Sequence, residues 1–455
     1  MRALGLESLR DTIAGEVVAP GDAGWDQARL AWNLLADQHP ALVVIAGEDA
    51  DIASTVRFAR GNGLRVAAQA TGHGATSLGD LRDAILLQTS RLNGISIDPQ
   101  ARTARVQAGT LWRDVIAAAA GHGLVGLHGM SGEVGVIGYT LGGGIGWLAR
   151  REGFASSHVR GFEVVTADGE ERHVDVDHEP DLFWALRGGG GNPAIVTGAE
   201  FALFELREAF AGSLLWPLEQ AHDVAHGYLA WIATVPDTVT STLKLMRFPP
   251  LPAIPEPLRG RAVAMVTLAF TGDEAQGTEL VAPLRAIAPP YLDTVTTIPA
   301  AGLGDIAGDP QEPLPAVGRA ALLQKLTAET VDAYVELAGP GVNSPLTILE
   351  IRHLGGALAA EAGDSGAAGP LEAEALVYGT GSPATPEMGA GLNRALEAMS
   401  QAMAPWTGQR RTLLTFDEQG PGIRGAFPNA VAERLASVSS AYDPDRRIMA
   451  NHSLD

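Results

Sequence analysis

The first part of the chain alternates short apolar runs with a helical pattern. "ALVVIAG" is an apolar run, the stretch from about Asp49 has the period of a helix with an aspartate at its start, and "LRVAAQA" is a second apolar run that leads to His73. This order predicts a β-α-β unit.

The same pattern continues to about residue 205. "AILLQ" and "TARVQAG" predict strands, "LWRDVIAAAA" predicts a helix that ends at Gly121 and Gly123, and "VRGFEVVTADGEERHVD" predicts a hairpin with a turn at Asp168 and Gly169. Short strands and helices are therefore arranged around glycine-rich loops in this first part.

Longer apolar strands begin after residue 206. "STLKLMRFP", "GRAVAMVTLAFTG" and "SPLTILEIRHLGG" alternate with helical stretches and with proline-rich links such as "PPLPAIPEPL". We predict an α+β protein in which residues 1–206 form one domain and residues 207–409 form a second domain, an antiparallel sheet covered by helices. Residues 410–455 are predicted to return to the first domain.

Composition narrows the possible partners and chemistry. The 455 residues are 46% hydrophobic, carry a formal net charge of −21 and include no cysteine. This charge disfavours nucleic acid and anionic membranes, and the lack of thiols means that redox chemistry needs a cofactor. The N-terminal segment has acidic residues and no apolar core of a signal peptide, and no run reaches membrane-spanning length, so we predict a cytoplasmic protein.

Glycines cluster in one stretch that suits a ligand. In "GEVGVIGYTLGGGIGWLARREG" they recur at positions 132, 135, 138, 142, 143, 144 and 146. Backbone amides without side chains can approach a pyrophosphate. The alternative is a structural glycine turn, and the absence of any Gly-Lys pair excludes a P-loop.

Several long motifs in a fixed order resemble a known family. "GHG", "LQTSRLNGISIDPQARTARVQAGTLWRDV", "GVIGYTLGGGIGWLARREG", "EVVTADGEERHVD" and "PDLFWALRGGGGNPAIVTGAEF" resemble the PCMH-type FAD-binding domain of the berberine bridge enzyme-like oxidoreductases in the vanillyl-alcohol oxidase superfamily. "YDPDRRIMANHSL" resembles the closing motif of that family, and the middle of the chain fits more weakly.

The resemblance implies a two-domain flavoprotein with FAD between two glycine loops and the substrate between the domains. His73 corresponds to the family histidine that bonds covalently to the flavin methyl group, and a neutral imidazole nitrogen can form this bond. The alternative is an ordinary polar loop histidine. The implied FAD-binding residues are Ala70, Thr71, Gly72, His73, Gly74, Ala75, Thr76, Leu78, Ser131, Gly132, Val134, Gly135, Gly138, Tyr139, Gly142, Gly143, Gly144, Val196 and Asn451.

The chain departs from the family pattern at three places. Ser131 stands where many members have a second, cysteine tether, so attachment is predicted through His73 only. "QATG" replaces the usual arginine-glycine-glycine before His73, which removes a positive charge. "NAVAERL", residues 429–435, lacks the tyrosine that assists proton removal in the family.

Candidates for the missing proton acceptor lie on two predicted strands. The strand-like "LEAEALVYG" alternates so that Glu372, Glu374, Leu376 and Tyr378 share one face, and Glu350 lies in "TILEIRHLGG". A carboxylate in an apolar cleft would have a raised pKa, as a base requires. The alternative is that these glutamates are exposed for solubility.

"HVDVDHEPD", His173 to Asp181, contains metal-type ligands, but the acids suit turn and N-cap roles, and we predict no metal. The leading hypothesis is an FAD-dependent oxidase that moves a hydride from an alcohol or amine carbon of a small molecule to flavin N5, with molecular oxygen as the acceptor. Alternatives are a flavin protein that catalyses a cyclisation or elimination, a flavin-binding scaffold, and a protein that keeps the fold without the cofactor. Neither the substrate nor the oligomeric state can be read from these residues.

Overall fold

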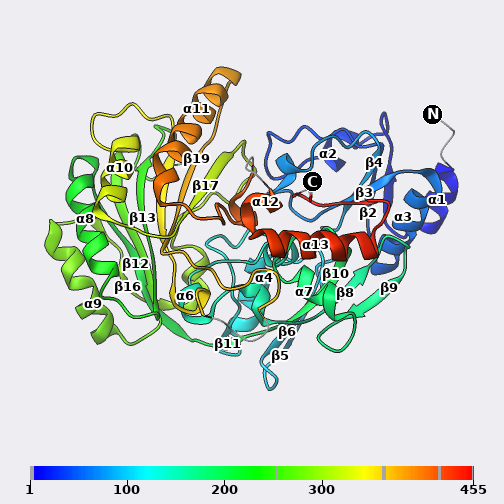
Figure 1. The fold of residues 1–455 in the computed structure, drawn as a ribbon, viewed down its shortest axis with the longest axis horizontal. Coiled ribbons are helices and arrows are strands. Elements are labelled where there is room, and N and C mark those ends of the chain that lie inside the picture. The colour runs from blue at the N-terminus through cyan, green and yellow to red at the C-terminus, as the bar shows by residue number, and fades with distance from the viewer. Residues whose placement is uncertain (1–4, 253, 361–364, 419–421, 453, 455) are drawn as a thin grey trace.

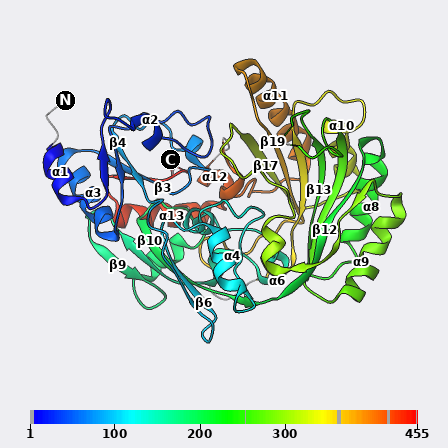
Figure 2. The ribbon, with the colours of Figure 1, turned by 180° about the vertical axis from the view of Figure 1, so that it is seen from behind.

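A computed structural model describes residues 5–252, 254–360, 365–418, 422–452 and 454. The first four residues of the N-terminal segment and Ser453 of the closing motif lie outside this range. Figure 1 shows two parts side by side, each built on its own β-structure, and Figure 2 shows the same two parts from behind.

The first sheet has the order β1-β2-β4-β3-β20, and its inner pairs are parallel. β2 and the first four residues of β4 are apolar because parallel strands are covered on both faces. The predicted β-α-β unit is β2, α3 and β3. The bounds are β1 Glu16–Val18, β2 Leu42–Ile45, β3 Arg65–Gln69, β4 Ala84–Gln88, β20 Ile448–Met449, α1 Leu6–Thr12, α2 Trp25–Ala28 and α3 Asp49–Asn62.

The second sheet has the order β5-β6-β10-β8-β9 and is antiparallel. β7 and β11 form a separate two-stranded sheet. The predicted hairpin is β8 and β9. The bounds are β5 Ile95–Asp98, β6 Thr103–Gln107, β7 Leu124–Val125, β8 Val159–Val165, β9 Glu171–Val174, β10 Ile195–Ala202, β11 Phe204–Glu205, α4 Trp112–Ala120, α5 Val136–Leu141, α6 Ala149–Glu152 and α7 Pro180–Leu186.

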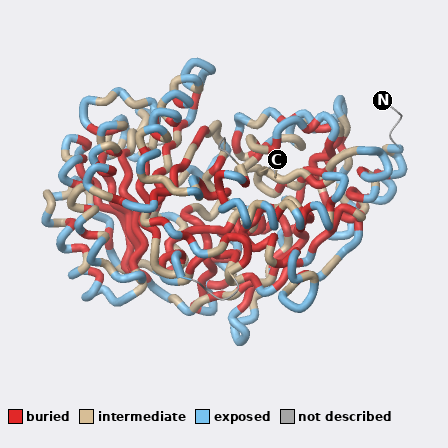
Figure 3. The backbone as a smooth tube through the Cα atoms, viewed as in Figure 1, coloured by how far each residue is buried: buried red, intermediate tan, exposed pale blue. Residues whose placement is uncertain are grey.

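The third sheet is eight-stranded and antiparallel, with the order β15-β12-β14-β13-β18-β19-β17 and β16 paired to β12. Helices α8 to α11 cover its outer face, and Figure 3 shows its strands as a continuous buried region. The bounds are β12 Glu208–Pro217, β13 Val239–Arg247, β14 Ala262–Phe270, β15 Leu292–Asp293, β16 Thr296–Pro299, β17 Val317–Leu323, β18 Ile348–His353, β19 Ala375–Gly381, α8 Ala221–Ile232, α9 Glu274–Ile287, α10 Ala328–Ala338 and α11 Pro386–Met403. The predicted α+β fold with a helix-covered antiparallel sheet is confirmed.

Alternation along the strands gives the third sheet two different faces. Leu243, Leu245 and Leu349 point to the helices and form the largest apolar core, while residues of the other parity face the first part of the chain. Leu376 and Leu322 on that second face pack against Ile145 and other apolar residues of the first part.

The C-terminal segment connects the two parts. After the third sheet it forms α12 (Ile423–Ala426) and α13 (Asn429–Tyr442), which packs against α7, and it ends with β20 beside β3. The limits at residues 206 and 409 stay predictions. Within the described residues, no helix is both long and apolar enough to span a bilayer.

Candidate active site

His73 lies in the loop after β3, partly buried between polar and aromatic neighbours. Thr71 Oγ1 is 2.8 Å from His73 Nδ1, and the indole of Trp32 stacks on the imidazole with ring centroids 4.1 Å apart. Burial lowers the pKa of His73 to about 4. The imidazole is therefore neutral at physiological pH, and one ring nitrogen keeps a free electron pair.

The C-terminal strand β20 and the residues after it fix the position of this loop. β20 pairs with β3, and Asn451 Nδ2 donates a hydrogen bond of 2.8 Å to the carbonyl oxygen of Gly74. A Cβ at Gly74 would lie 2.3 Å from Asn451 Nδ2, so a side chain there would displace the Asn451 amide. Asn451 is one of the residues predicted to bind the cofactor, and in the structure it positions the His73 loop.

The second glycine segment faces the first. A Cβ at Gly135 would lie 3.5 Å from Ala70 Cβ and 3.9 Å from Thr71 Cγ2, so the two loops are neighbours. Gly144 has φ +78° and its Cβ would lie 2.5 Å from the Tyr139 ring, whereas a Cβ at Gly138 would meet no atom within 4 Å. The segment is close-packed at Gly144 and open at Gly138.

The remaining predicted cofactor residues occupy the same region. Those at positions 70–78 form the loop between β3 and β4, those at 131–144 form α5 and its flanks, and Val196 is buried on β10, which α5 contacts. Ser131 Oγ accepts a hydrogen bond of 3.3 Å from the N–H of Glu133.

Buried hydroxyls in this region fit a polar ligand. In the part of the chain that the structure describes, Thr76 Oγ1 and the Tyr139 hydroxyl are buried and have no hydrogen-bond partner. A buried polar group normally has one, and a bound ligand that reached these hydroxyls would supply it. The residues present fit FAD on this ground and through the open backbone at Gly138.

A row of polar side chains crosses the inner face of the third sheet. Lys244 on β13 pairs with Glu350 on β18, and Glu350 pairs with Tyr378 on β19. All three point away from the helix-covered core, toward the first part of the chain. Charged side chains are seldom buried unless they are paired, so these residues distinguish this face from an ordinary apolar core.

Glu350 is an ion-pair partner. Its carboxylate lies 2.7 Å from Arg352 Nε and 3.5 Å from Lys244 Nζ. Burial raises the pKa of Glu350, but the charges and hydrogen bonds of Arg352 and Lys244 together bring it below the ordinary value. The prediction that Glu350 is a base with a raised pKa is therefore wrong. Glu350 is ionised, and together with Lys244 and Arg352 it leaves one net positive charge on this face.

Glu418 is a carboxyl group that the sequence analysis missed. Tyr378 Oη donates a hydrogen bond of 3.2 Å to Glu418 Oε1, and the Phe416 ring packs against Tyr378 with centroids 5.5 Å apart. Burial raises the pKa of Glu418 to about 7. The only sequence signal is the pair of acids Asp417 and Glu418 after the apolar "LLTF", which is too common to identify a base.

Glu372 and Glu374 lie elsewhere, so their prediction as strand residues facing the cofactor is wrong. β19 begins at Ala375, after both glutamates. Glu372 is exposed, and Glu374 pairs at 2.6 Å with Lys325 Nζ and accepts a hydrogen bond of 2.9 Å from the N–H of Leu326. These partners satisfy Glu374 at the rim of the sheet.

The segment that carries Glu418 lies against the His73 loop and against the second glycine segment. Ser77 Oγ, four residues after His73, donates a hydrogen bond of 3.1 Å to the carbonyl oxygen of Glu418. A Cβ at Gly142 would lie 2.6 Å from Thr415 Cγ2. Residues 414–418 therefore lie against both glycine loops, and the side chain of Glu418 meets Tyr378 of the sheet.

The comparisons with known proteins fit this geometry. Residues 40–175 match the family described as FAD binding domain. (R)-6-hydroxynicotine oxidase of Paenarthrobacter nicotinovorans is 36% identical over 206 residues, 45% of each chain. Glucooligosaccharide oxidase of Sarocladium strictum is 36% identical over 188 residues, 41% of this chain and 38% of the other. The chain spans about half the length of the curated relatives it matches.

Solved structures extend the likeness to the whole fold. 6-Hydroxy-D-nicotine oxidase from Arthrobacter nicotinovorans covers 97% of this chain and 98% of its own, with a TM-score of 0.82 and 23% identity. The wild-type BBE-like 1 protein of Physcomitrella patens covers 99% of both chains, with a TM-score of 0.84 and 17% identity. At these identities the likeness is one of fold.

Proposed function

We propose that this chain is an FAD-dependent oxidase of a small organic alcohol or amine. It belongs to the vanillyl-alcohol oxidase superfamily and carries a PCMH-type FAD-binding domain. Two relatives are named as oxidases, one of 6-hydroxynicotine and one of glucooligosaccharides. Their match covers less than half of this chain, so the activity and the substrate class are our inference.

The observation that carries the proposal is the hydrogen bond from Ser77, in the His73 loop, to the backbone carbonyl of Glu418, whose carboxylate accepts a hydrogen bond from Tyr378. It supports a proton acceptor on a segment that contacts the loop fitting a flavin. Oxidation of an alcohol or amine removes a hydride from carbon and a proton from oxygen or nitrogen, so both functions are needed at one place.

FAD, when bound, supplies the acceptor for the hydride. The protein supplies the rest. The Tyr378 oxygen accepts the proton of the substrate hydroxyl or amine while its own proton passes to the Glu418 carboxylate. Because the pKa of Glu418 is raised to about 7, a substantial fraction of it is ionised at neutral pH and can accept this proton. Lys244, Glu350 and Arg352 give this face a fixed positive charge that orients polar substrate groups.

We propose that the flavin is attached through His73 alone. The neutral imidazole, with a pKa of about 4, supports a bond from its free nitrogen, and Ser131 has no thiol for a second bond. Acid precipitation of the purified protein tests this. Yellow colour should stay with the wild-type pellet and wash out of His73→Ala; colour that washes out of both proteins contradicts the attachment.

The activity is tested by anaerobic mixing with panels of alcohols, sugars and cyclic amines. We expect one class to bleach the flavin absorbance, and admission of oxygen to restore the colour with formation of hydrogen peroxide. Bleaching without reoxidation by oxygen would make the protein a dehydrogenase with another acceptor. Failure of every substrate to bleach bound flavin would favour a non-oxidative reaction or a flavin-binding scaffold.

Three further expectations rest on the sequence. They are a small-molecule partner, no binding to nucleic acid or membranes, and a cytoplasmic location. Fractionation of the producing cells tests the location.

A further inference from the structure

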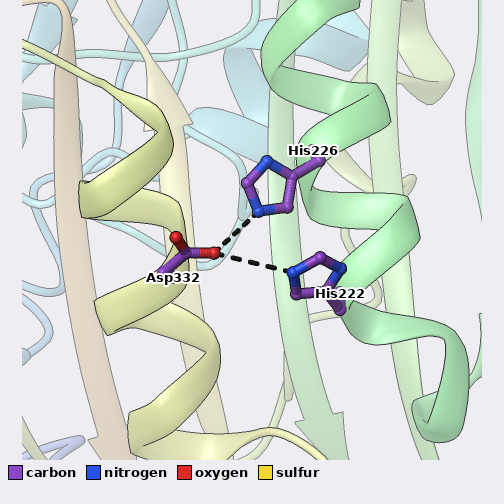
Figure 4. A group of neighbouring side chains, drawn as sticks. All are labelled: His222, His226 and Asp332. Carbon is purple, nitrogen blue, oxygen red and sulfur yellow. Dashed lines mark hydrogen bonds and ion pairs between the residues drawn. The ribbon is translucent and has the colours of Figure 1, made fainter.

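Two histidines and an aspartate converge on the outer side of the third sheet. His222 and His226 lie one helical turn apart on α8, and Asp332 projects toward them from the neighbouring α10 (Figure 4). His226 Nε2 is 2.8 Å and His222 Nε2 is 3.6 Å from Asp332 Oδ1. We propose that these three side chains bind a divalent transition-metal cation, with Zn²⁺ as the expected occupant.

The donor atoms and their spacing suit this ion. Imidazole nitrogen and carboxylate oxygen are Zn²⁺ ligands at about 2.0–2.2 Å, and in a tetrahedral site two ligands are about 3.3 Å apart. The observed separations from Asp332 Oδ1 lie on either side of that value, and one ligand atom from each residue lies within 4.8 Å of the others. Small side-chain rotations would bring all three to the ion, and water would fill the fourth position.

A second carboxylate lies behind one of the ligands. While His222 Nε2 points to Asp332, its Nδ1 is 3.5 Å from Asp223 Oδ1. Histidines that bind metals usually direct their other ring nitrogen to a carboxylate or carbonyl, which fixes the ring and makes it a better ligand. His222 already has this arrangement.

The two helices hold the ligands on a rigid base. Val224 and Tyr228 of α8 and Val331 and Tyr334 of α10 are fully buried beneath the cluster. The Tyr334 hydroxyl donates to the carbonyl oxygen of Leu349, 2.7 Å away, and so ties α10 to the sheet. The ligand side chains are partly exposed, so an ion can enter from solvent while the backbone beneath them stays in place.

In a second histidine cluster the side chains lie close together, but their nitrogen atoms do not converge on one carboxylate oxygen. His173 and His178 bind different oxygens of Asp175, at 3.1 and 2.9 Å, and the second nitrogen of His173 binds Glu163. Within the described residues, His222, His226 and Asp332 are the group in which three such atoms converge. His178 therefore provides a matched control.

The ion would join α8 to α10 on the side of the sheet opposite the candidate active site. Because the unfolded chain does not bring residues 222, 226 and 332 together, Zn²⁺ would bind the folded state and stabilise it. The net charge of −21 favours cation binding. The site is independent of the proposed oxidase activity.

The test is calorimetric titration with ZnCl₂ of the full chain, purified without a histidine tag and stripped of metal. We expect one Zn²⁺ per chain and a higher melting temperature at saturation. His226→Ala and Asp332→Ala should each weaken binding at least about tenfold. His178→Ala should leave binding unchanged, and MgCl₂ should not compete because Mg²⁺ prefers oxygen ligands.

The absence of saturable Zn²⁺ binding by the folded chain would overturn the proposal, and so would equal affinity in His226→Ala and the wild type. Asp332→His separates a lost ligand from a misfolded variant, since it keeps three ligands and should restore the binding that Asp332→Ala loses. Electron paramagnetic resonance with Cu²⁺ in the site should show coupling to imidazole nitrogen, and this coupling should be reduced in His222→Ala.

Discussion

The Glu418 carboxyl controls the proposed proton transfer at the scale of single residues. It accepts a proton only when it is ionised, and its pKa of about 7 means that the ionised fraction falls as the pH falls below 7. We predict that kcat falls on the acid side with a midpoint near this value. Glu418→Gln should lower kcat by about a hundredfold or more and remove this acid limb.

A pH profile of kcat on the best substrate measures this prediction. Glu372→Gln is the control, because Glu372 is an exposed carboxyl on the neighbouring segment and should leave both the rate and the profile unchanged. An acid limb that persists in Glu418→Gln would assign the titration to another group.

Gly138 offers a test that separates folding from flavin binding. A Cβ at Gly138 meets no atom of the protein within 4 Å, and the same holds for Gly61 in α3. Alanine in place of a helical glycine should stabilise either position by about 0.5–1 kcal/mol. If the cofactor approaches the backbone at Gly138, only Gly138→Ala should also lose FAD.

Urea unfolding and the ratio of flavin to protein after purification measure the two effects. Equal flavin content in Gly138→Ala and Gly61→Ala would show that the cofactor does not approach the backbone at Gly138.

At the scale of elements, a buried aspartate forms the turn between α13 and β20. Asp443 accepts hydrogen bonds of 2.7 Å from the N–H groups of Arg447 and Ile448. Asp443→Ala would leave both donors without this acceptor, at a cost of about 1–3 kcal/mol for each one that stays buried. Because β20 leads to Asn451, which holds the His73 loop, we predict that flavin content falls as well.

Urea unfolding of the Asp443→Ala variant measures the loss of stability. Asp445→Ala changes an exposed carboxyl in the same turn and should alter the free energy of unfolding by no more than about 0.5 kcal/mol. A comparable loss in both variants would mean that the turn, and not the two hydrogen bonds of Asp443, determines the effect.

The start of β19 shows how an element boundary decides which residues can act. "LEAEALVYG" has the alternation of a strand over its whole length, but the ladder with β17 and β18 begins at Ala375. Glu374 precedes it and binds Lys325 and the backbone of Leu326. Pairing with strands distant in sequence set this boundary, so the local pattern did not contain it.

At the scale of the whole molecule, buried histidines connect stability to pH. Burial lowers the pKa of His73 and His452 to about 4 and that of His353 to about 3. A histidine in the unfolded chain titrates near pH 6.5, so at lower pH the unfolded chain binds more protons. These three groups therefore reduce stability as the pH falls from about 6.5 toward 4.

His353 allows a measurement of this effect. Arg150 Nη1 donates a hydrogen bond of 2.8 Å to His353 Nε2, which requires an unprotonated nitrogen, and Arg150 also binds Asp237. Since Arg150 belongs to α6 and His353 to β18, this contact joins the two parts of the chain. We predict that His353→Gln has a smaller loss of stability on acidification than the wild type.

The measurement is the free energy of unfolding in urea at neutral pH and at a pH below 6 for both proteins. Glu418 acts in the opposite direction, because a raised carboxyl pKa costs stability as the pH rises, so the difference between variant and wild type is the informative quantity. Parallel pH dependences would mean that His353 has a similar pKa in both states.

The sequence by itself determined the local elements and the loops that fit the cofactor. The hydrophobic periodicity of consecutive residues predicts the strands around α3, the hairpin at Asp168 and the helix-covered antiparallel sheet. The ordered motifs that resemble those of the flavoprotein family, each on a short segment of chain, led to His73, Gly138 and Asn451. A single chain segment carries each of these signals.

Only the tertiary structure decided which polar groups act together. Glu350 pairs with Lys244 from β13 in addition to its strand neighbour Arg352, Glu418 meets Tyr378 across 40 residues, and Asp332 reaches His226 across 106 residues. The i, i+4 spacing of His222 and His226 is visible in the sequence, but their partner is not. Such groups are brought together by strand pairing and helix packing, which depend on burial over the whole chain and leave no local pattern at the residues concerned.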